Sequence, residues 1–299
     1  MSADNNNDGL DTSCCAACGI AAVDEIKLKE CDDCDLVKYC SDECQHNHKS
    51  QHKKECKKRA AELRDVLLFK QPESGNLGDC PICCLPLPLS IDKSLMYHCC
   101  SKLICNGCAL ANVMRELEQR RSPLCPFCRD PSITDEESDK RRMKRVEAND
   151  PVAFRQEGME QYKKGEYIKA FEYWTKGAEL GDAESQYQLA GLYNEGDGVE
   201  VDIGKETHHL EEAAIGGHPH ARYLLGRYEF NDGNAARAVK HWIIAAKQGD
   251  DNSMKKLLEV FKAGFMEKDD LTAALRAHKA AVDATKSPQR RAAEAAKGC

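Results

Sequence analysis

The distribution of cysteine constrains this chain more than any other feature of its sequence. Of 18 cysteines, 17 lie between Cys14 and Cys128, and the next 170 residues contain none before Cys299. A short segment with few apolar residues needs disulfides or metal ions to fold, whereas a cysteine-free segment must fold by apolar packing. The sequence therefore predicts a front part held by cross-links and a rear part held by its own core.

The front cysteines occur in pairs whose members are three or four positions apart. These pairs are Cys15/Cys18, Cys31/Cys34, Cys40/Cys44, Cys80/Cys83, Cys105/Cys108 and Cys125/Cys128. A C-x2-C turn directs two thiolates at one tetrahedral zinc ion about 2.3 Å away. Disulfides are the alternative, but they need an oxidising compartment, and the polar, acidic start of the chain lacks the features of a secretory signal. We therefore expect zinc.

Composition narrows the classes of partner. The chain has 299 residues, 41% of them hydrophobic and 31% charged, as in soluble globular proteins of two or three domains. Its net charge of −7 argues against a nucleic-acid partner, which requires an excess of Lys and Arg. Two basic stretches, residues 53–59 and 140–145, are interpreted as solvated helix faces or linkers, the second alternatively as a nuclear-localisation signal. We expect a cytoplasmic and/or nuclear protein with no membrane partner.

Residues 14–58 combine eight candidate ligands with few apolar side chains. The candidates are Cys15, Cys18, Cys31, Cys34, Cys40, Cys44, His52 and Cys56. His52 and Cys56 are four residues apart and would share one face of a helix. Eight ligands suffice for two tetrahedral ions, and each structural zinc contributes about 10 to 16 kcal/mol to folding. We expect this module to be unfolded without zinc.

The stretch 38–45 (KYCSDECQ), followed by His52 and Cys56, resembles the MYND zinc finger. The resemblance implies a protein-interaction role, with a shallow groove for short proline-containing peptides. It also implies interleaved sites, one held by Cys15, Cys18, Cys40 and Cys44, the other by Cys31, Cys34, His52 and Cys56. Lys49 stands where family members carry an aromatic residue, which alters the groove but not the ligands. Cys14 is spare, and we expect a surface thiol there.

Residues 79–131 contain three more C-x2-C pairs, and His98, Cys99 and Cys100 compete for a fourth. Cys99 with Cys100 is the first choice and His98 with Cys100 the second. The pattern resembles a RING finger in an all-cysteine variant, with Lys102 where the common version has histidine. The RING cross-brace would group Cys80, Cys83, Cys105 and Cys108 on one ion, and Cys99, Cys100, Cys125 and Cys128 on the other. With two zinc ions per module, we expect about four in the chain.

The RING resemblance also implies contacts with a ubiquitin-conjugating enzyme. The matching residues are Ile82, Pro126 and Arg129, together with a helix expected over residues 109–120. Such a ligase has no nucleophile of its own and acts by positioning a thioester. The alternative is that Ile82 and Pro126 pack a small core and Arg129 is solvated.

The rear segment repeats itself. Ala170, Trp174, Ala178 and Gly181 recur at the same spacing as Ala238, Trp242, Ala246 and Gly249. A period of about 32 to 36 residues with two helices per unit predicts an α-solenoid. Residues 186–201 and 213–218 resemble the SEL-one-like repeat, a relative of the tetratricopeptide repeat, which implies a curved scaffold that holds client proteins. Trp174 and Trp242 are interpreted as core wedges, and His208, His209, His218 and His220 as packing or solvated residues rather than ligands.

The expected fold class is thus two small zinc-stabilised α+β modules followed by an all-α solenoid of SEL-one-like helix pairs. The solenoid is expected over residues 151–285. The remaining parts are a disordered start (1–13), a helix and linker (59–78), a charged linker (132–150) and a flexible tail (286–299). The order of modules resembles a family of algal-type multidomain proteins.

Two functional hypotheses follow. In the first, the chain is a ubiquitin ligase whose repeats hold the client while the RING-like module recruits the conjugating enzyme. In the second, it is a non-enzymatic scaffold that uses all three modules for protein binding. A MYND-containing methyltransferase is disfavoured because the sequence has no cofactor-binding domain around the finger.

Overall fold

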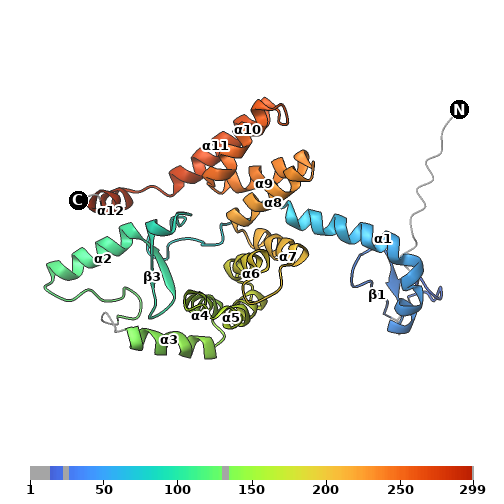
Figure 1. The fold of residues 1–299 in the computed structure, drawn as a ribbon, viewed down its shortest axis with the longest axis horizontal. Coiled ribbons are helices and arrows are strands. Elements are labelled where there is room, and N and C mark those ends of the chain that lie inside the picture. The colour runs from blue at the N-terminus through green and yellow to red at the C-terminus, as the bar shows by residue number, and fades with distance from the viewer. Residues whose placement is uncertain (1–13, 23–26, 130–134, 298–299) are drawn as a thin grey trace. The chain divides into compact units, whose positions relative to one another are not determined.

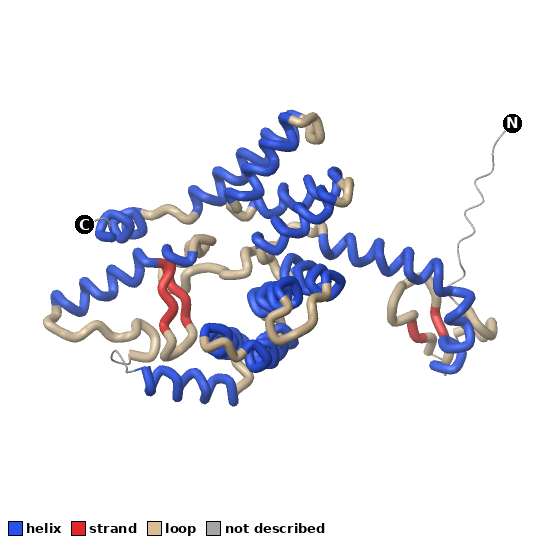
Figure 2. Tube along the Cα trace, viewed as in Figure 1, coloured by secondary structure: helices blue, strands red, loops and turns tan. Residues whose placement is uncertain are grey.

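The chain divides between Lys70 and Gln71 into two compact units in this computed structural model. The structure describes residues 14–22, 27–129 and 135–297, so the expected disordered start lies outside the described residues. Figure 2 shows that helices dominate and that strands form two short pairs in the described chain. None of the described helices is both long and apolar enough to span a lipid bilayer.

The first unit consists of a short hairpin and one long helix. The strands β1 (Lys29–Glu30) and β2 (Lys38–Tyr39) pair antiparallel, and helix α1 (Asp42–Leu68) follows. Helix α1 begins where it does because the extended Ser41 accepts a hydrogen bond from the backbone N–H of Cys44 at 3.2 Å. The buried cluster of this unit consists of Val37, Tyr39 and several cysteines. The unit therefore buries little apolar surface apart from its cysteines.

The second unit begins with the second cysteine-rich module. Its elements are η1 (Ile91–Lys93), β3 (Ser94–Tyr97), β4 (Lys102–Cys105) and α2 (Asn106–Glu118). Strands β3 and β4 pair antiparallel, with Ser94 opposite Cys105. Helix α2 begins directly after Cys105, whose extended backbone (φ −69°, ψ 150°) precedes the first turn. The hairpin therefore delivers one cysteine to the start of the helix, and Cys108 lies in its first turn.

The cysteine-free rear forms the predicted solenoid of helix pairs (Figure 1). The helices are α4 (Pro151–Lys163), α5 (Tyr167–Glu179), α6 (Ala183–Glu195), α7 (Ile203–Ile215), α8 (Pro219–Asn231), α9 (Ala235–Lys247), α10 (Asp251–Lys262) and α11 (Lys268–Ala284). The carboxylates of Asp150, Asp182, Asp202 and Asp250 cap helix starts by accepting backbone N–H groups. The predicted fold class is confirmed.

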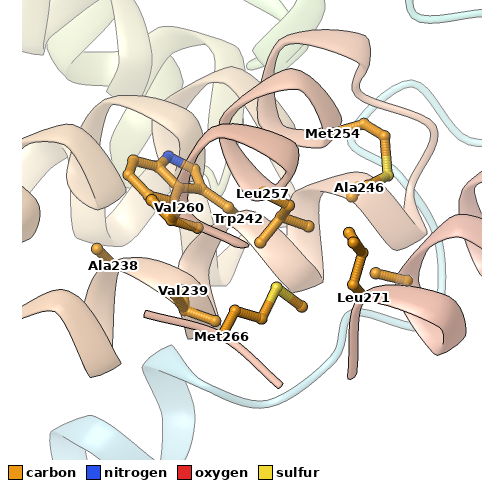
Figure 3. Packing of buried hydrophobic residues seen from close by; sticks show 10 residues of the cluster. Ala238, Val239, Trp242, Ala246, Met254, Leu257, Val260, Met266 and Leu271 are labelled. Carbon is orange, nitrogen blue, oxygen red and sulfur yellow. The ribbon is translucent and has the colours of Figure 1, made fainter. Parts of the chain in front are cut away.

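Two tryptophans anchor the cores of the repeats. Trp174 and Trp242 are each 1% exposed, and Figure 3 shows Trp242 among the apolar side chains that surround it. The Nε1 of each tryptophan donates to a backbone carbonyl at 3.2 Å, that of Arg155 and that of Tyr223 respectively. Each indole thus buries its ring and satisfies its only donor. The interpretation of these residues as core wedges agrees with the structure.

The segment expected to be a charged linker is largely helical. Helix α3 (Asp135–Glu147) packs against α4. The guanidinium of Arg142, 8% exposed, donates to Glu157 at 2.7 Å and to Asp139 at 2.7 Å. A buried cation with two carboxylate partners fixes its helix in place. The basic stretch is therefore not wholly a solvated face, which corrects the sequence-based expectation.

The expected flexible tail also differs from the structure. Residues Pro288–Lys297 form helix α12, which packs against α2 of the second cysteine-rich module (Figure 1). Arg290 in this helix is 6% exposed. The composition of the tail, polar and rich in alanine, did not reveal this contact, because its partners lie about 200 positions earlier in the chain.

Candidate metal centres

Two groups of ligand atoms lie in the first unit. Cys15 and Cys18 come from a turn, Cys40 from the end of the hairpin and Cys44 from the first turn of α1. The sulfurs of Cys18 and Cys40 are 3.6 Å apart, as are those of Cys40 and Cys44. Capping of α1 by Ser41 places Cys44 beside Cys40. The start of the helix thus completes the first group.

The second group is fully buried and contains the only histidine among the four groups in the described chain. The Sγ of Cys34 lies 3.1 Å from Nε2 of His52, and the sulfurs of Cys31 and Cys56 are 3.8 Å apart. Burial lowers the pKa of His52 below its usual value, which favours the neutral ring that a metal requires. The face of α1 that carries His52 and Cys56 therefore supplies two metal-ligating atoms beside the C-x2-C turn at Cys31.

The second cysteine-rich module holds the other two groups. They are Cys80, Cys83, Cys105 and Cys108, and Cys99, Cys100, Cys125 and Cys128. The sulfurs of Cys83 and Cys105 are 3.8 Å apart, and those of Cys100 and Cys125 are 3.7 Å apart. The first and third pairs along the chain thus lie together, as do the second and fourth. His98 is not part of any group in the described residues, so the structure places the first-choice pair at this position.

Three of the cysteine turns share one backbone geometry. The residue after the second cysteine is Gly19, Cys84 or Arg129, with φ of 75°, 55° and 58°. Its N–H donates to the carbonyl of the first cysteine at 2.8, 2.8 and 3.0 Å respectively. This left-handed turn orients the backbone N–H groups of the C-x2-C turn toward the cysteine sulfurs. It also explains why Cys84 points away from the neighbouring group and is exposed.

The spacing of the sulfurs discriminates between zinc and disulfides. Sulfurs at the corners of a tetrahedron around zinc are about 3.8 Å apart when each Zn–S distance is about 2.3 Å, whereas disulfide sulfurs are about 2.05 Å apart. The sulfur contacts within the groups span 3.3 to 3.8 Å, and all ligand atoms of each group lie within 4.8 Å of one another. The donor sets, thiolates with one imidazole, suit zinc. The four groups therefore fit about four Zn²⁺ ions, which would cross-link the segments that carry them.

A cavity lined partly by lysines lies beside the second group. A cavity of about 470 Å³ is lined by Tyr39 and by Lys49, Lys53 and Lys57 of α1. These lysines are four residues apart, so they follow one edge of the helix. Lys49, which stands where MYND family members carry an aromatic residue, thus lines this cavity.

A buried carboxylate forms ion pairs with three arginines near the C-terminal end of the second module. Glu116 of α2 is 0% exposed and pairs with Arg115 at 2.9 Å, Arg121 at 3.0 Å and Arg129 at 3.3 Å. Burial raises the pKa of Glu116, but hydrogen bonding to Arg115 and the charges of Arg121 and Arg129 outweigh it, so the net pKa lies below its usual value. Arg129 is therefore tied to its own module, although its side chain is 49% exposed.

The other predicted contact residues are accessible. Ile82 is 44% exposed and Pro126 is half-buried. The expected helix is α2, which begins three residues before the expected start. On this helix, Ala109 is buried whereas Leu117 is 54% exposed.

Comparisons with known proteins identify two of the three parts. Residues 15–56 match the family model of the MYND finger. This segment is a MYND finger. Residues 156–182, 183–218 and 219–250 match the Sel1 repeat, so helices α4 to α9 contain three Sel1 repeats, and α10 and α11 add a fourth helix pair beyond them. Among curated proteins, none matches the chain.

Two solved structures are similar to this chain over part of its length. A Sel1 repeat protein from Oxalobacter formigenes is 25% identical, and the match covers 60% of this chain and 73% of that one with a TM-score of 0.45. A protective antigen of uropathogenic Escherichia coli strains that displays an SLR fold is 22% identical. That match covers 50% of this chain and 34% of the antigen, with a TM-score of 0.42.

The repeat histidines serve packing. His209 stacks on Tyr193 and hydrogen-bonds Gln186 at 2.7 Å, and His218 caps α8. In the part of the chain that the structure describes, neither belongs to a group that could hold a metal ion. Sequence reasoning missed Glu116 and Arg290, because neither residue belongs to a motif, although each contacts a residue that does: Arg129 and Cys83 respectively.

Proposed function

We propose that this chain is a zinc-folded protein adaptor whose second cysteine-rich module is a RING-type docking platform for a ubiquitin-conjugating enzyme. The observation that carries the proposal is the interleaved grouping of its cysteines, in which the pair at Cys80 lies with the pair at Cys105, and Cys99 and Cys100 with the pair at Cys125. This cross-brace is the arrangement that the RING resemblance implies.

Exposed apolar side chains on this module support the proposal. Ile82 in the first knuckle is 44% exposed, and Met114 and Leu117 of α2 are 50% and 54% exposed. Met114 and Leu117 are three residues apart and are therefore neighbours on the helix surface. Large apolar groups that remain exposed on a small module are candidates for protein contacts. A bound conjugating enzyme would shield them from water.

The proposed mechanism is positional. A RING-type ligase needs no nucleophile of its own, because it acts by holding the thioester of another enzyme in a reactive geometry. The ion pair with Glu116 would hold the guanidinium of Arg129 at the edge of the second knuckle. From there it could donate to a carbonyl of the docked enzyme or of ubiquitin.

The repeats would hold the client. A groove of about 460 Å³ lies along α4, α6 and α8 and is lined by Tyr162, Glu195 and Glu206. Glu206 is 3% exposed; its Oε1 accepts from Tyr228 at 2.5 Å, while Oε2 has no partner in the described chain. A buried carboxylate oxygen without a donor is costly. A client that presents a Lys or Arg side chain would satisfy it.

The test is autoubiquitination by the full-length protein with a panel of conjugating enzymes, after zinc occupancy has been verified. We expect ubiquitin chains with at least one conjugating enzyme and a loss of about tenfold or more on Ile82→Ala. Leu95→Ala is the matched control, since Leu95 on β3 is also 44% exposed, and it should leave activity near the wild-type level. Absence of chains with every enzyme, or equal effects of the two variants, would refute the docking proposal.

A scaffold without ligase activity is the second candidate. The observation that favours it is the binding of Arg129 to Glu116, which accounts for this arginine as part of the fold. In that case the protein would capture clients on the repeats and produce no ubiquitin chains. Retained client binding by a zinc-loaded protein that is inactive with all conjugating enzymes would support it.

A further inference from the structure

The C-terminal helix lies directly against the third group of cysteines. Helix α12 packs on α2, and the two meet at Gly107, between Cys105 and Cys108. A Cβ atom at Gly107 would lie 2.7 Å from the backbone nitrogen of Arg290 and 2.8 Å from the backbone carbon of Gln289. Such distances are shorter than atoms can approach, so only glycine at position 107 allows this contact. The two helices are therefore fitted backbone to backbone.

Arg290 reaches from α12 into the loop around the first knuckle of the module. One nitrogen, Nη1, donates to the carbonyls of Pro86 and Thr285, both at 2.7 Å. The other, Nη2, donates to the carbonyl of Leu85 at 3.2 Å and to Sγ of Cys83 at 3.4 Å. The guanidinium thus binds the residues that follow Cys83 and the sulfur of Cys83 itself.

The charge of this arginine lacks an ordinary counterion. Arg290 is 6% exposed, and within the described residues it forms no ion pair with a carboxylate. A buried cation is costly unless an anion lies close by. Four thiolates around one Zn²⁺ carry a net charge of about −2, and Cys83 belongs to such a group. The metal-bound sulfurs would therefore be the negative charge that balances the guanidinium of Arg290.

We propose that Arg290 is a positioning residue for the zinc site of Cys80, Cys83, Cys105 and Cys108, so that helix α12 completes this site from the far end of the chain. The arginine orients the thiolate of Cys83 and offsets the negative charge of the loaded site. Partners behind the ligands commonly affect metal affinity by about 10- to 100-fold. Lys93 of η1 and Glu294 of α12, 3.0 Å apart, form a further contact between the module and α12 at the surface.

The proposal makes the repeats and the second cysteine-rich module one functional unit. Arg290 and Cys83 are separated by 207 positions in the sequence, and the whole repeat region lies between them. A change that pulled α11 and α12 away from the module would withdraw a donor from the zinc site. Metal retention in this module would then depend on the packing of α12 against α2.

The test is metal release from full-length, reduced protein, followed with a colorimetric chelator. The variant Arg290→Gln removes the charge and the fork of donors, and Arg291→Gln is the control, since Arg291 is the exposed neighbour on the same helix. We expect Arg290→Gln to release one of about four zinc ions roughly 10- to 100-fold faster than wild type. Arg291→Gln should match wild type. Equal release by the two variants would overturn the proposal.

A second readout separates positioning from simple unfolding. If Arg290→Gln merely unfolded the module, two ions would be released together, whereas loss of positioning affects only the ion at Cys83. Cobalt-substituted protein adds a spectroscopic check, because loss of an N–H···S bond shifts the thiolate-to-cobalt charge-transfer bands of that site. Arg290→Lys keeps the positive charge but not the paired N–H donors of the guanidinium, so it should restore part of the zinc retention. Joint release of two ions, or an unchanged cobalt spectrum, would reject the positioning role.

The inference rests on metal occupancy of this group, which the zinc content of the wild-type protein measures separately. Gly107→Ala offers an independent variant, because it displaces α12 without altering Arg290 or any cysteine. It should accelerate release of the same single ion. A Gly107→Ala protein with wild-type release would contradict the proposal.

Discussion

Gly158 lies beneath the indole of Trp174, so close that a Cβ atom on the glycine would be 2.4 Å from Nε1. Gly226 and Trp242 repeat this relationship, with a corresponding distance of 2.5 Å. In both cases the glycine precedes the tryptophan by 16 residues and lies on the preceding helix. The close approach of the two helices of a repeat therefore requires glycine at this crossing.

Alanine at either crossing should destabilise the repeats. We expect Gly158→Ala to lower the free energy of unfolding by about 1 to 3 kcal/mol, because the added methyl group must displace the indole. Gly191→Ala is the control: Gly191 lies within α6 and has open space around it, so alanine should raise stability by up to about 1 kcal/mol. Urea unfolding followed by tryptophan fluorescence measures both. A neutral Gly158→Ala would show that the indole can shift freely.

The left-handed turn at Arg129 predicts an unusual order of stability. Arg129→Ala and Arg129→Gly both remove the ion pair with Glu116, but only glycine adopts φ near 58° without strain. We expect the glycine variant to be more stable than the alanine variant by about 1 kcal/mol. Thermal unfolding of the zinc-loaded proteins measures the difference. An alanine variant that is equally stable would mean that the turn relaxes without cost.

The repeats should lose stability on acidification in a window set by His209. Burial lowers the pKa of His209 to about 4, from the usual 6.5. Between these values the unfolded chain binds a proton that the folded chain does not, so stability falls as the pH falls from about 6.5 to 4. Because the ring is partly exposed, we expect a loss of about 1 to 2 kcal/mol.

His209→Phe should flatten this part of the pH profile, whereas His208→Phe, at an exposed position, should retain it. Both tryptophans of the chain lie in the repeats, so their fluorescence reports on this region and not on the zinc modules.

A second loss of stability, between about pH 4.5 and 2, should persist in both variants. Although burial raises the pKa of Glu184, its hydrogen bond and ion pair with His218 outweigh this and lower the net pKa to about 2. Identical profiles for the two variants between pH 6.5 and 4 would count against the assignment to His209.

Chelation of metal should open the first unit and spare the repeats. The buried cluster around the ligands of that unit consists of four cysteines together with Val37 and Tyr39, so little apolar burial remains there once the metal is removed. Hydrogen exchange in residues 27–58 should rise to nearly unprotected rates, while tryptophan fluorescence stays unchanged. Protection that survives chelation in this segment would contradict a metal-dependent fold.

Local spacing predicted much of the fold, because zinc-binding turns and repeated helix pairs both depend on residue spacings that can be read directly from the sequence. Cysteines three or four residues apart must be neighbours, and the recurrence of Trp174 as Trp242 reports a repeated helix pair. The sequence did not single out Gly158 and Gly226, because their role appears only in the close contact of each with its tryptophan. Contacts between distant segments left no such pattern: Arg142 is buried by Glu157 of the next helix, and Arg290 by a loop 204 to 207 positions away.

The zinc content of the reduced, full-length protein tests the central claim most directly. Elemental analysis should find about four zinc ions per chain, one for each group of cysteine and histidine ligands. Substitution of Cys31 or Cys125 by serine should each remove at least one ion. A protein that contains essentially no bound metal and yet retains hydrogen-exchange protection in residues 27–58 and 79–129 would contradict the account.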